Sequence, residues 1–339
     1  MKYLLRLLIL LFIPSIIITC EEETFPLIHI TQTESAFDPE LAFGSVATER
    51  TFGISNWGSG TLSWTISENI NWLTTDKTTG NSGKDTTIVT VTINRDGLEP
   101  GVYTGNIELT GGIENISMKV TMVVAITGTF TDSRDNHTYH WVKIGDQVWM
   151  SENLAWLPKV SPSADGSFTE PFYYVHSYNG TNVSEAKTTD NYKTYGALYN
   201  WPAALEACPE GWHLPSNDEW EQLAQYIGTE LGPYSREESR WTDGEGDHLS
   251  VTWGWLGRHL ANFGDGTDDF GFSGSPGGNR GSRGDFGYTG YGHWWSAVES
   301  SNYDYKAWGA GLAITYGTPE FFMMCVYRDC GNSVRCIKD

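Results

Sequence analysis

Residues 198–223 read LYNWPAALEACPEGWHLPSNDEWEQL, and the second half of this stretch carries the clearest start of a helix in the chain. The Ser216 hydroxyl can accept a hydrogen bond from an orphan backbone N–H, and Glu219, three residues later, can return a bond to the Ser216 amide. Apolar residues then recur at helical spacing, and Gly228 is placed to end the helix: Trp220, Leu223, Ala224, Ile227. The pattern predicts a capped helix that packs one face on a core.

The first half of the stretch predicts a shorter helix that starts near Tyr199 and brings Cys208 to its far end. Trp212 and Trp220 flank the entry to the second helix, where a large aromatic side chain is more simply explained by packing than by contact with a sugar. This part of the chain is therefore interpreted as a frame rather than as a binding surface.

Length and composition limit the possible functions. A chain of 339 residues is long enough for two folded units and a targeting segment. The aromatic content of 14%, the 38 glycines and only 19% charged residues favour β-rich, turn-dense structure. A formal charge of −21 repels phosphate backbones and anionic lipids, so nucleic-acid binding is not expected and charge gives no route to a membrane.

Residues 1–20 predict an export signal that ends in a lipid anchor. Lys2 and Arg6 precede an apolar stretch that is too short to span a bilayer, and the segment ends at Cys20 in a sequence that resembles a bacterial lipobox. The glutamates at 21–23 resemble the acidic tag of surface lipoproteins in Bacteroidetes, although a solvated charge run is the simpler alternative. We expect residues 21–26 to be an acidic tether and the protein to be an outer-membrane, cell-surface lipoprotein, held to the membrane only by this lipid.

Residues 27–127 show short alternating strands about ten residues apart, separated by Gly and Asn turns, which predicts an antiparallel β-sandwich. The motifs NWG at 56–58, LSWTI at 62–66 and GVYTG at 101–105 resemble the BACON domain, which implies an immunoglobulin-like sandwich. Trp64 and Trp72 are expected in its core. Trp57 lies in a turn, where it could stack on a sugar ring or be partly buried against Trp64; a spacer role is the main expectation for this unit.

Residues 128–339 open with a predicted hairpin around the turn at 144–146. Read with this opening, three further stretches resemble the Fibrobacter succinogenes major paralogous domain: residues 195–223, the stretch at 268–297 and the terminal GNSVRCIKD. That resemblance implies a C-type-lectin-like α+β fold related to formylglycine-generating enzymes. The expected fold class is therefore mainly β plus α+β, a sandwich followed by a lectin-like domain.

Four cysteines remain after Cys20, and three pairings are open to them. We favour Cys208 with Cys336, which closes a long loop and fits the lectin-like resemblance, and Cys325 with Cys330 across a tight hairpin. The alternative for the second pair is a copper-binding thiolate pair, because their four-residue gap is that of the formylglycine-generating relatives.

Two further sets of side chains are candidates for binding. Carboxylates in a glycine-rich loop can converge on calcium, although solvated loop acids are the simpler alternative: Asp265, Asp268, Asp269. The string at 271–292 lacks the features of a phosphate-binding loop and resembles the long loop of lectin-like folds, so we place the candidate ligand surface there: Arg280, Arg283, Asp285, Tyr288, Tyr291, Trp294. Trp295 is assigned to the strand core.

No catalytic set is suggested by these residues. The predicted function is non-catalytic binding of a polysaccharide or another surface protein, with no cofactor except a possible calcium ion. The alternatives are a formylglycine-generating type of oxidoreductase that uses Cys325 and Cys330, and a purely structural surface subunit.

Overall fold

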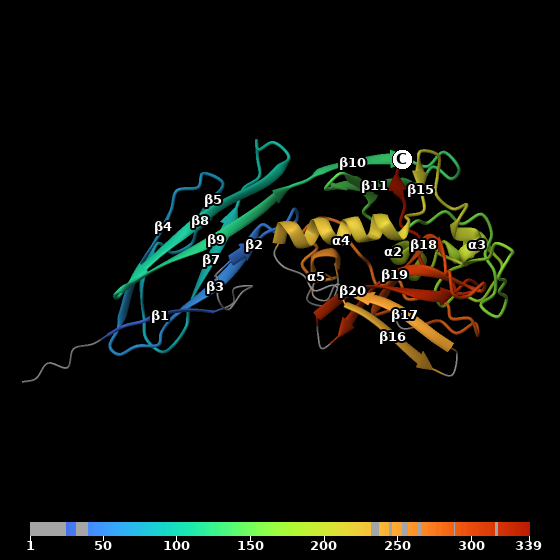
Figure 1. Cartoon of the computed structure of the whole chain (residues 1–339). Helices are drawn as coiled ribbons and strands as arrows, with labels where there is room; N and C mark the ends of the chain where they lie inside the picture. Colours follow the sequence, from blue (N-terminus) through green and yellow to red (C-terminus); the bar gives the residue numbers. More distant parts are fainter. Residues whose placement is uncertain are drawn as a thin grey trace, which may run out of the picture.

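The computed structural model describes residues 25–31, 40–231, 237–243, 246–252, 257–262, 266–287, 289–315 and 318–339. Antiparallel strands dominate it, which confirms the mainly β prediction. The strands form two lobes, an N-terminal sandwich and a larger C-terminal lobe that also carries the helices (Figure 1).

Two sheets form the N-terminal sandwich. The first has the order β1 (Ile28–Thr31), β3 (Glu49–Asn56), β7 (Thr87–Ile93), β5 (Leu73–Thr75). The second has the order β2 (Glu40–Ala42), β9 (Glu114–Val124), β8 (Gly101–Gly111), β4 (Leu62–Glu68), β6 (Thr79–Ser82). All the pairs are antiparallel except β2 with β9.

The alternation of apolar residues sets the inner faces of this sandwich. Val89, Val91 and Ile93 point inward from β7, because successive side chains of a strand lie on opposite faces. Trp64 and Trp72 are buried in the same core, as the sequence predicts. The indole N–H of Trp64 donates to the Ser82 hydroxyl at 3.0 Å, which satisfies its one polar atom.

Three sheets build the C-terminal lobe. The first has the order β10 (Ile126–Thr131), β11 (Thr138–Ile144), β12 (Gln147–Met150), β21 (Ile337–Lys338), β15 (Trp212–His213). The second pairs β13 (Tyr173–Tyr174) with β14 (Leu198–Tyr199). The third has the order β16 (Glu237–Asp243), β17 (Gly246–Thr252), β20 (Thr318–Tyr327), β19 (Lys306–Thr315), β18 (Tyr291–Glu299). The predicted hairpin is confirmed as β11 and β12, with Gly145 in the left-handed region at φ 59°. The helices are α1 (Val183–Ala186), α2 (Asp190–Tyr195), α3 (Trp201–Ala204), α4 (Asn217–Leu231), α5 (Gly257–Leu260).

Helix α4 begins as the sequence predicts. The Ser216 backbone N–H donates to Glu219 Oε2 at 2.7 Å, and the Glu219 N–H donates to the Ser216 hydroxyl at 3.3 Å. The helix continues past Gly228 to Leu231, so the predicted end was wrong. The indole of Trp220 lies 4.7 Å from that of Trp149, which anchors α4 on the sheet of β12.

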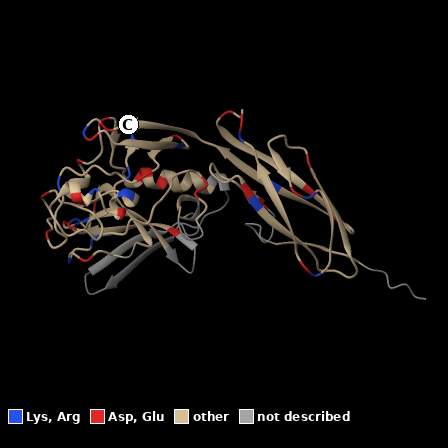
Figure 2. Cartoon of the chain, turned by 180° about the vertical axis from the view of Figure 1, so that it is seen from behind, with Lys and Arg blue, Asp and Glu red and all other residues tan. Residues whose placement is uncertain are grey.

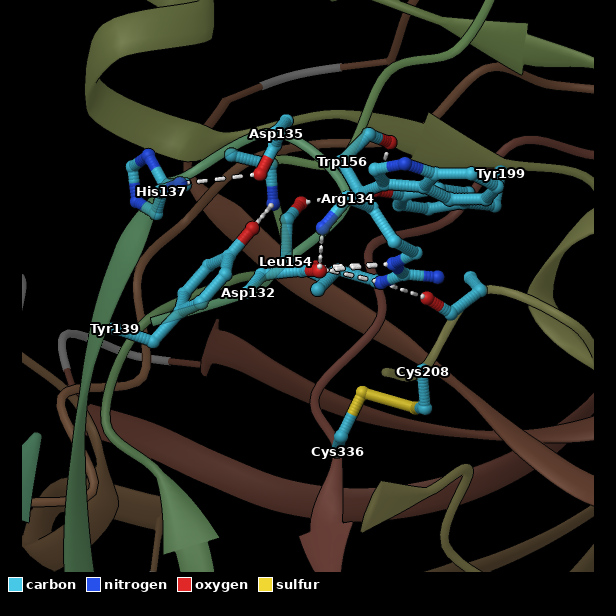
Figure 3. A network of polar contacts seen from close by, with 12 residues as sticks. Asp132, Arg134, Asp135, His137, Tyr139, Leu154, Trp156, Tyr199, Cys208 and Cys336 are labelled. Carbon is cyan, nitrogen blue, oxygen red and sulfur yellow. Dashed lines mark hydrogen bonds and ion pairs between the residues drawn. A yellow bond between two sulfur atoms is a disulfide. The ribbon is translucent and has the colours of Figure 1, made fainter. Parts of the chain in front are cut away.

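A disulfide joins Cys208 to Cys336 across 128 residues and ties the terminal strand β21 to the segment after α3, as predicted. Figure 3 shows this bridge beside a polar network centred on Arg134. The Arg134 guanidinium donates to the Asp132 carboxylate at 2.7 Å and to the Ala207 carbonyl at 2.8 Å, and it lies 4.1 Å from the Trp156 ring. The turn between β10 and β11 is thereby fixed to the residue that precedes Cys208.

An ion pair connects the two lobes. Arg50 of β3 donates to the Asp269 carboxylate at 2.9 Å, and the Asp269 side chain is fully buried. The Ser45 backbone N–H donates to the Asp269 carbonyl, and at Gly44 a Cβ atom would overlap the Asp269 backbone. The lobes therefore meet closely at a position that requires glycine.

Candidate functional site

Trp294 was predicted to face a ligand, and the structure corrects this. Its ring is fully buried and packs edge-on to Phe272. Its indole N–H donates to Asn153 Oδ1 at 2.8 Å, and the same oxygen accepts a bond from the buried guanidinium of Arg335. Trp294 is part of the frame of the lobe, because a buried indole with a satisfied N–H offers no face to solvent. Trp295 is buried as expected.

Arg280 is a second correction. Only 1% of its surface is exposed. Its guanidinium donates to the carbonyl of Ser163 at 2.8 Å and to that of Asp329 at 2.8 Å, and it lies over the Tyr174 ring. A buried arginine whose donors bond backbone carbonyls holds loops together, so Arg280 does not contribute to a ligand surface.

The remaining candidates of the glycine-rich string are divided. Arg283, Asp285 and Tyr291 are exposed, and they stay a predicted ligand surface. Tyr288 lies outside the described residues. Three of the six predicted residues are therefore exposed, and two are buried.

The acidic cluster does not converge on one point. Asp268 accepts bonds from the Ser273 backbone N–H and hydroxyl, both at 2.7 Å, and burial raises the pKa of its carboxyl to about 6. Asp269 is bonded to Arg50 and to the Thr267 hydroxyl, and Asp265 lies outside the described residues. Among the described residues, no group of three or more potential ligands is placed to hold a metal ion, so this arrangement does not support the predicted calcium site.

Cys325 and Cys330 do not form the predicted bridge, and both are buried thiols. Cys325 points from β20 toward Ser300 and Lys306, whereas Cys330 belongs to the same hydrophobic core cluster as Val334. Burial raises the pKa of the Cys325 thiol, although Ser300 and Lys306 act in the opposite direction. A raised pKa disfavours the thiolate that metal binding and nucleophilic attack require.

An open cleft of about 570 Å³ lies on the N-terminal sandwich, and sequence reasoning did not find it. Its wall is the segment 67–72, which includes the last two residues of β4, and its floor is formed by β8 and by Lys119 of β9. A Cβ atom at Gly105 would overlap Ile70, so the glycine lets this segment lie close to β8. We name this feature the β4–β8 cleft; its polar lining residues are Ser67, Glu68, Asn69, Asn71, Thr104, Asn106, Glu108, Lys119.

The lining of the β4–β8 cleft suits hydroxyl-rich ligands. The side chains of Asn69, Asn71 and Asn106 are exposed, and no hydrogen bond joins their amides to another described residue. Each amide offers both donors and an acceptor, which is what a sugar hydroxyl needs. The alternation Asn69-x-Asn71 beside the buried Trp72 is the signal in the sequence that could have identified it.

Trp57 is 67% exposed, so the alternative of burial against Trp64 is wrong. Its ring stacks on His29 with ring centroids 3.5 Å apart. It therefore remains a candidate for contact with a partner outside the chain.

Cys20 and the glutamates at 21–23 lie outside the described residues. In the described part of the chain, no helix has both the length and the apolar character that a membrane span needs. Figure 2 shows acidic and basic residues interspersed along the ribbon of both lobes.

Comparison with known proteins identifies two families. The profile described as the Fibrobacter succinogenes major domain matches residues 142–338, and the profile described as the viral BACON domain matches residues 27–124. Neither description names a catalytic activity. Comparison with curated proteins gives no match.

Two solved structures of the S-layer protein SbsC show a weak likeness. The structure of rSbsC(31-844) is 11% identical with a TM-score of 0.22, and the alignment covers 68% of this chain and 23% of that one. The structure of SbsC domains 5–6 is 12% identical with a TM-score of 0.19, and it covers 67% of this chain and 90% of that one. The chain thus spans about a quarter of the first of these proteins, and TM-scores this low support no argument about function.

Proposed function

We propose that this chain, which belongs to the Fibrobacter succinogenes major domain family over residues 142–338, is a non-catalytic surface lipoprotein that binds a neutral glycan. The observation that carries the binding role is the β4–β8 cleft with its three exposed asparagine amides. Its volume is within the range of small-ligand sites, roughly 300–1,000 Å³. The lipid at Cys20 supplies the anchor.

The charges around the cleft favour a neutral ligand. Glu68 and Glu108 place two carboxylates on its lining, and Lys119 is engaged with Glu40 at 2.9 Å. The whole chain carries a formal charge of −21. Uronic acids and sulfated sugars would be repelled by this field, whereas the hydroxyls of neutral sugars can donate to the carboxylates.

A glycan array followed by calorimetric titration tests the proposal. We expect the mature chain to bind neutral oligosaccharides without calcium, and the double variant Asn71→Ala/Asn106→Ala to lose at least about tenfold in affinity, since each lost hydrogen bond contributes about 1 kcal/mol. Asn115→Ala is the matched control, because Asn115 is an exposed asparagine of the same sheet outside the cleft. Equal affinity of both variants, or a preference for anionic sugars, would contradict the proposed site.

One observation favours an oxidoreductase as the second candidate function: Cys325 and Cys330 are thiols rather than a disulfide. We expect both thiols to react with a water-soluble thiol reagent in the unfolded chain and to be protected from it in the native chain. We also expect a weak competing chelator to remove added Cu(I) from the native chain. Copper held stoichiometrically by the native chain, and lost in Cys325→Ala, would favour the enzyme.

A further inference from the structure

A group of apolar side chains is exposed where the described chain begins. Phe25 is 55% exposed, Trp57 is 67% exposed and Ile113 is 76% exposed, with Leu27 beside them. We name these four residues the tether-end patch. Scattered apolar residues are ordinary on a surface, but a group of large ones with an indole marks an interaction site.

Backbone contacts place these residues together. The segment 25–28 passes between two turns: the Ser59 N–H donates to the Phe25 carbonyl at 3.1 Å, and the Ile28 N–H donates to Glu114 Oε2 at 2.7 Å. A Cβ atom at Gly58 would overlap the Phe25 carbonyl, and one at Gly112 would crowd the Pro26 carbonyl. Both turns therefore hold the segment closely, and the patch is fixed before any partner arrives.

The position of the patch indicates what covers it. Figure 1 shows that the chain enters the sandwich at the end that is remote from the C-terminal lobe. Phe25 is the fifth residue after Cys20, and five steps of extended chain span at most about 18 Å. If Cys20 is lipidated, Phe25 at the edge of the patch cannot be farther than this from the lipid-bearing residue.

We propose that the tether-end patch docks on the lipid headgroup region of the membrane that holds the anchor, so that the sandwich stands on the bilayer with its cleft and the C-terminal lobe directed outward. This inference rests on the proposed lipidation of Cys20. Tryptophan favours the membrane interface because its ring is apolar and its N–H is polar. A second contact also strengthens attachment, since a lipid chain and an apolar patch bind the same surface together.

Spin-label accessibility measures the docking. A nitroxide is attached to the cysteine of Ile113→Cys or of Val102→Cys in the lipidated full chain, which is then reconstituted in phosphatidylcholine vesicles. The native thiols of Cys325 and Cys330 are buried and are therefore not labelled. Val102 is the matched control: it is an exposed aliphatic residue at the start of β8, whereas Ile113 follows its end, about 33 Å away along the strand. We expect the label at 113 to be several-fold more accessible to oxygen relative to an aqueous nickel complex than the label at 102.

The docking would be overturned, and the anchor left intact, if chains that float with the vesicles gave equal, water-like ratios of oxygen to nickel accessibility at positions 113 and 102. Loss of flotation in the wild-type chain would overturn the anchor and the docking together. A water-exposed label combined with loss of glycan binding in Trp57→Ala would also overturn it and assign the patch to a sugar.

Discussion

Trp294 and Trp57 both lie within two residues of a glycine, but the side chain of one is buried and that of the other is exposed. Each is close to a glycine, at 292 and at 58. Trp294 is buried and bonded to Asn153, whereas Trp57 is exposed and stacks on one histidine. The difference shows that a tryptophan close to a glycine in this chain can belong either to the frame of the C-terminal lobe or to the exposed surface of the N-terminal sandwich.

The long disulfide should contribute more to the stability of the C-terminal lobe than any other single element. Replacing Cys208 and Cys336 together with alanine should lower the free energy of unfolding by about 5 kcal/mol, because the chain-entropy model assigns that value to a loop of this length. Denaturant titration measures it. Cys325→Ala removes a buried thiol without a bridge and is the control; equal losses in the two variants would show that the bridge does not brace the lobe.

The two tryptophans can be compared directly by truncation. Trp294→Ala should cost roughly 3–5 kcal/mol, as for other buried aromatic residues, and it also leaves Asn153 with fewer partners. Trp57→Ala should change the free energy of unfolding by less than about 0.5 kcal/mol, because its ring is mostly in water. Similar losses for both variants would remove the distinction between frame and surface.

Much of the frame could be predicted, because its signals are local. The capping box at Ser216 and Glu219 and the alternation of Val89, Val91 and Ile93 depend on neighbours in sequence. The Cys208–Cys336 bridge was favoured by loop length and resemblance, and it is confirmed.

Two of the candidate ligand residues, Arg280 and Trp294, were mispredicted, because burial in loops depends on distant residues. Arg280 is buried by contacts with Ser163 and Asp329, and Trp294 by contact with Asn153, and nothing near either residue in the sequence indicates these partners. The β4–β8 cleft was missed for the same reason, since its wall and its floor come from segments more than thirty residues apart. The local rule that loops carry binding residues favours the C-terminal lobe, whereas we propose a site on the N-terminal sandwich.

A smaller effect concerns the pH dependence of the frame. Burial disfavours the charged form of His213, but its hydrogen bonds to Glu219 at 2.8 Å and to Asp339 at 2.7 Å outweigh this, and the net result is a raised pKa. The folded state thus binds a proton more tightly than the unfolded state. The resulting stabilisation is present below the unfolded pKa of about 6.5 and is lost as pH rises through the folded pKa.

His213→Gln should remove this part of the pH dependence. The effect should be below about 1 kcal/mol, since the group is partly exposed and solvent screens the pairs. Unfolding measured at pH 5.5 and pH 8.5, which are about one unit below and two above the usual histidine pKa, gives the difference. If the variant keeps the same pH dependence of the free energy of unfolding, that dependence belongs to other titratable groups.

Hydrogen–deuterium exchange with and without a saturating neutral oligosaccharide tests most directly whether binding belongs to the N-terminal sandwich. The ligand should slow exchange in residues 67–72 and 104–108, which line the β4–β8 cleft, and leave residues 281–291 of the glycine-rich string unchanged. Slower exchange at 281–291 with no change at the cleft would return the site to the C-terminal lobe and contradict this account.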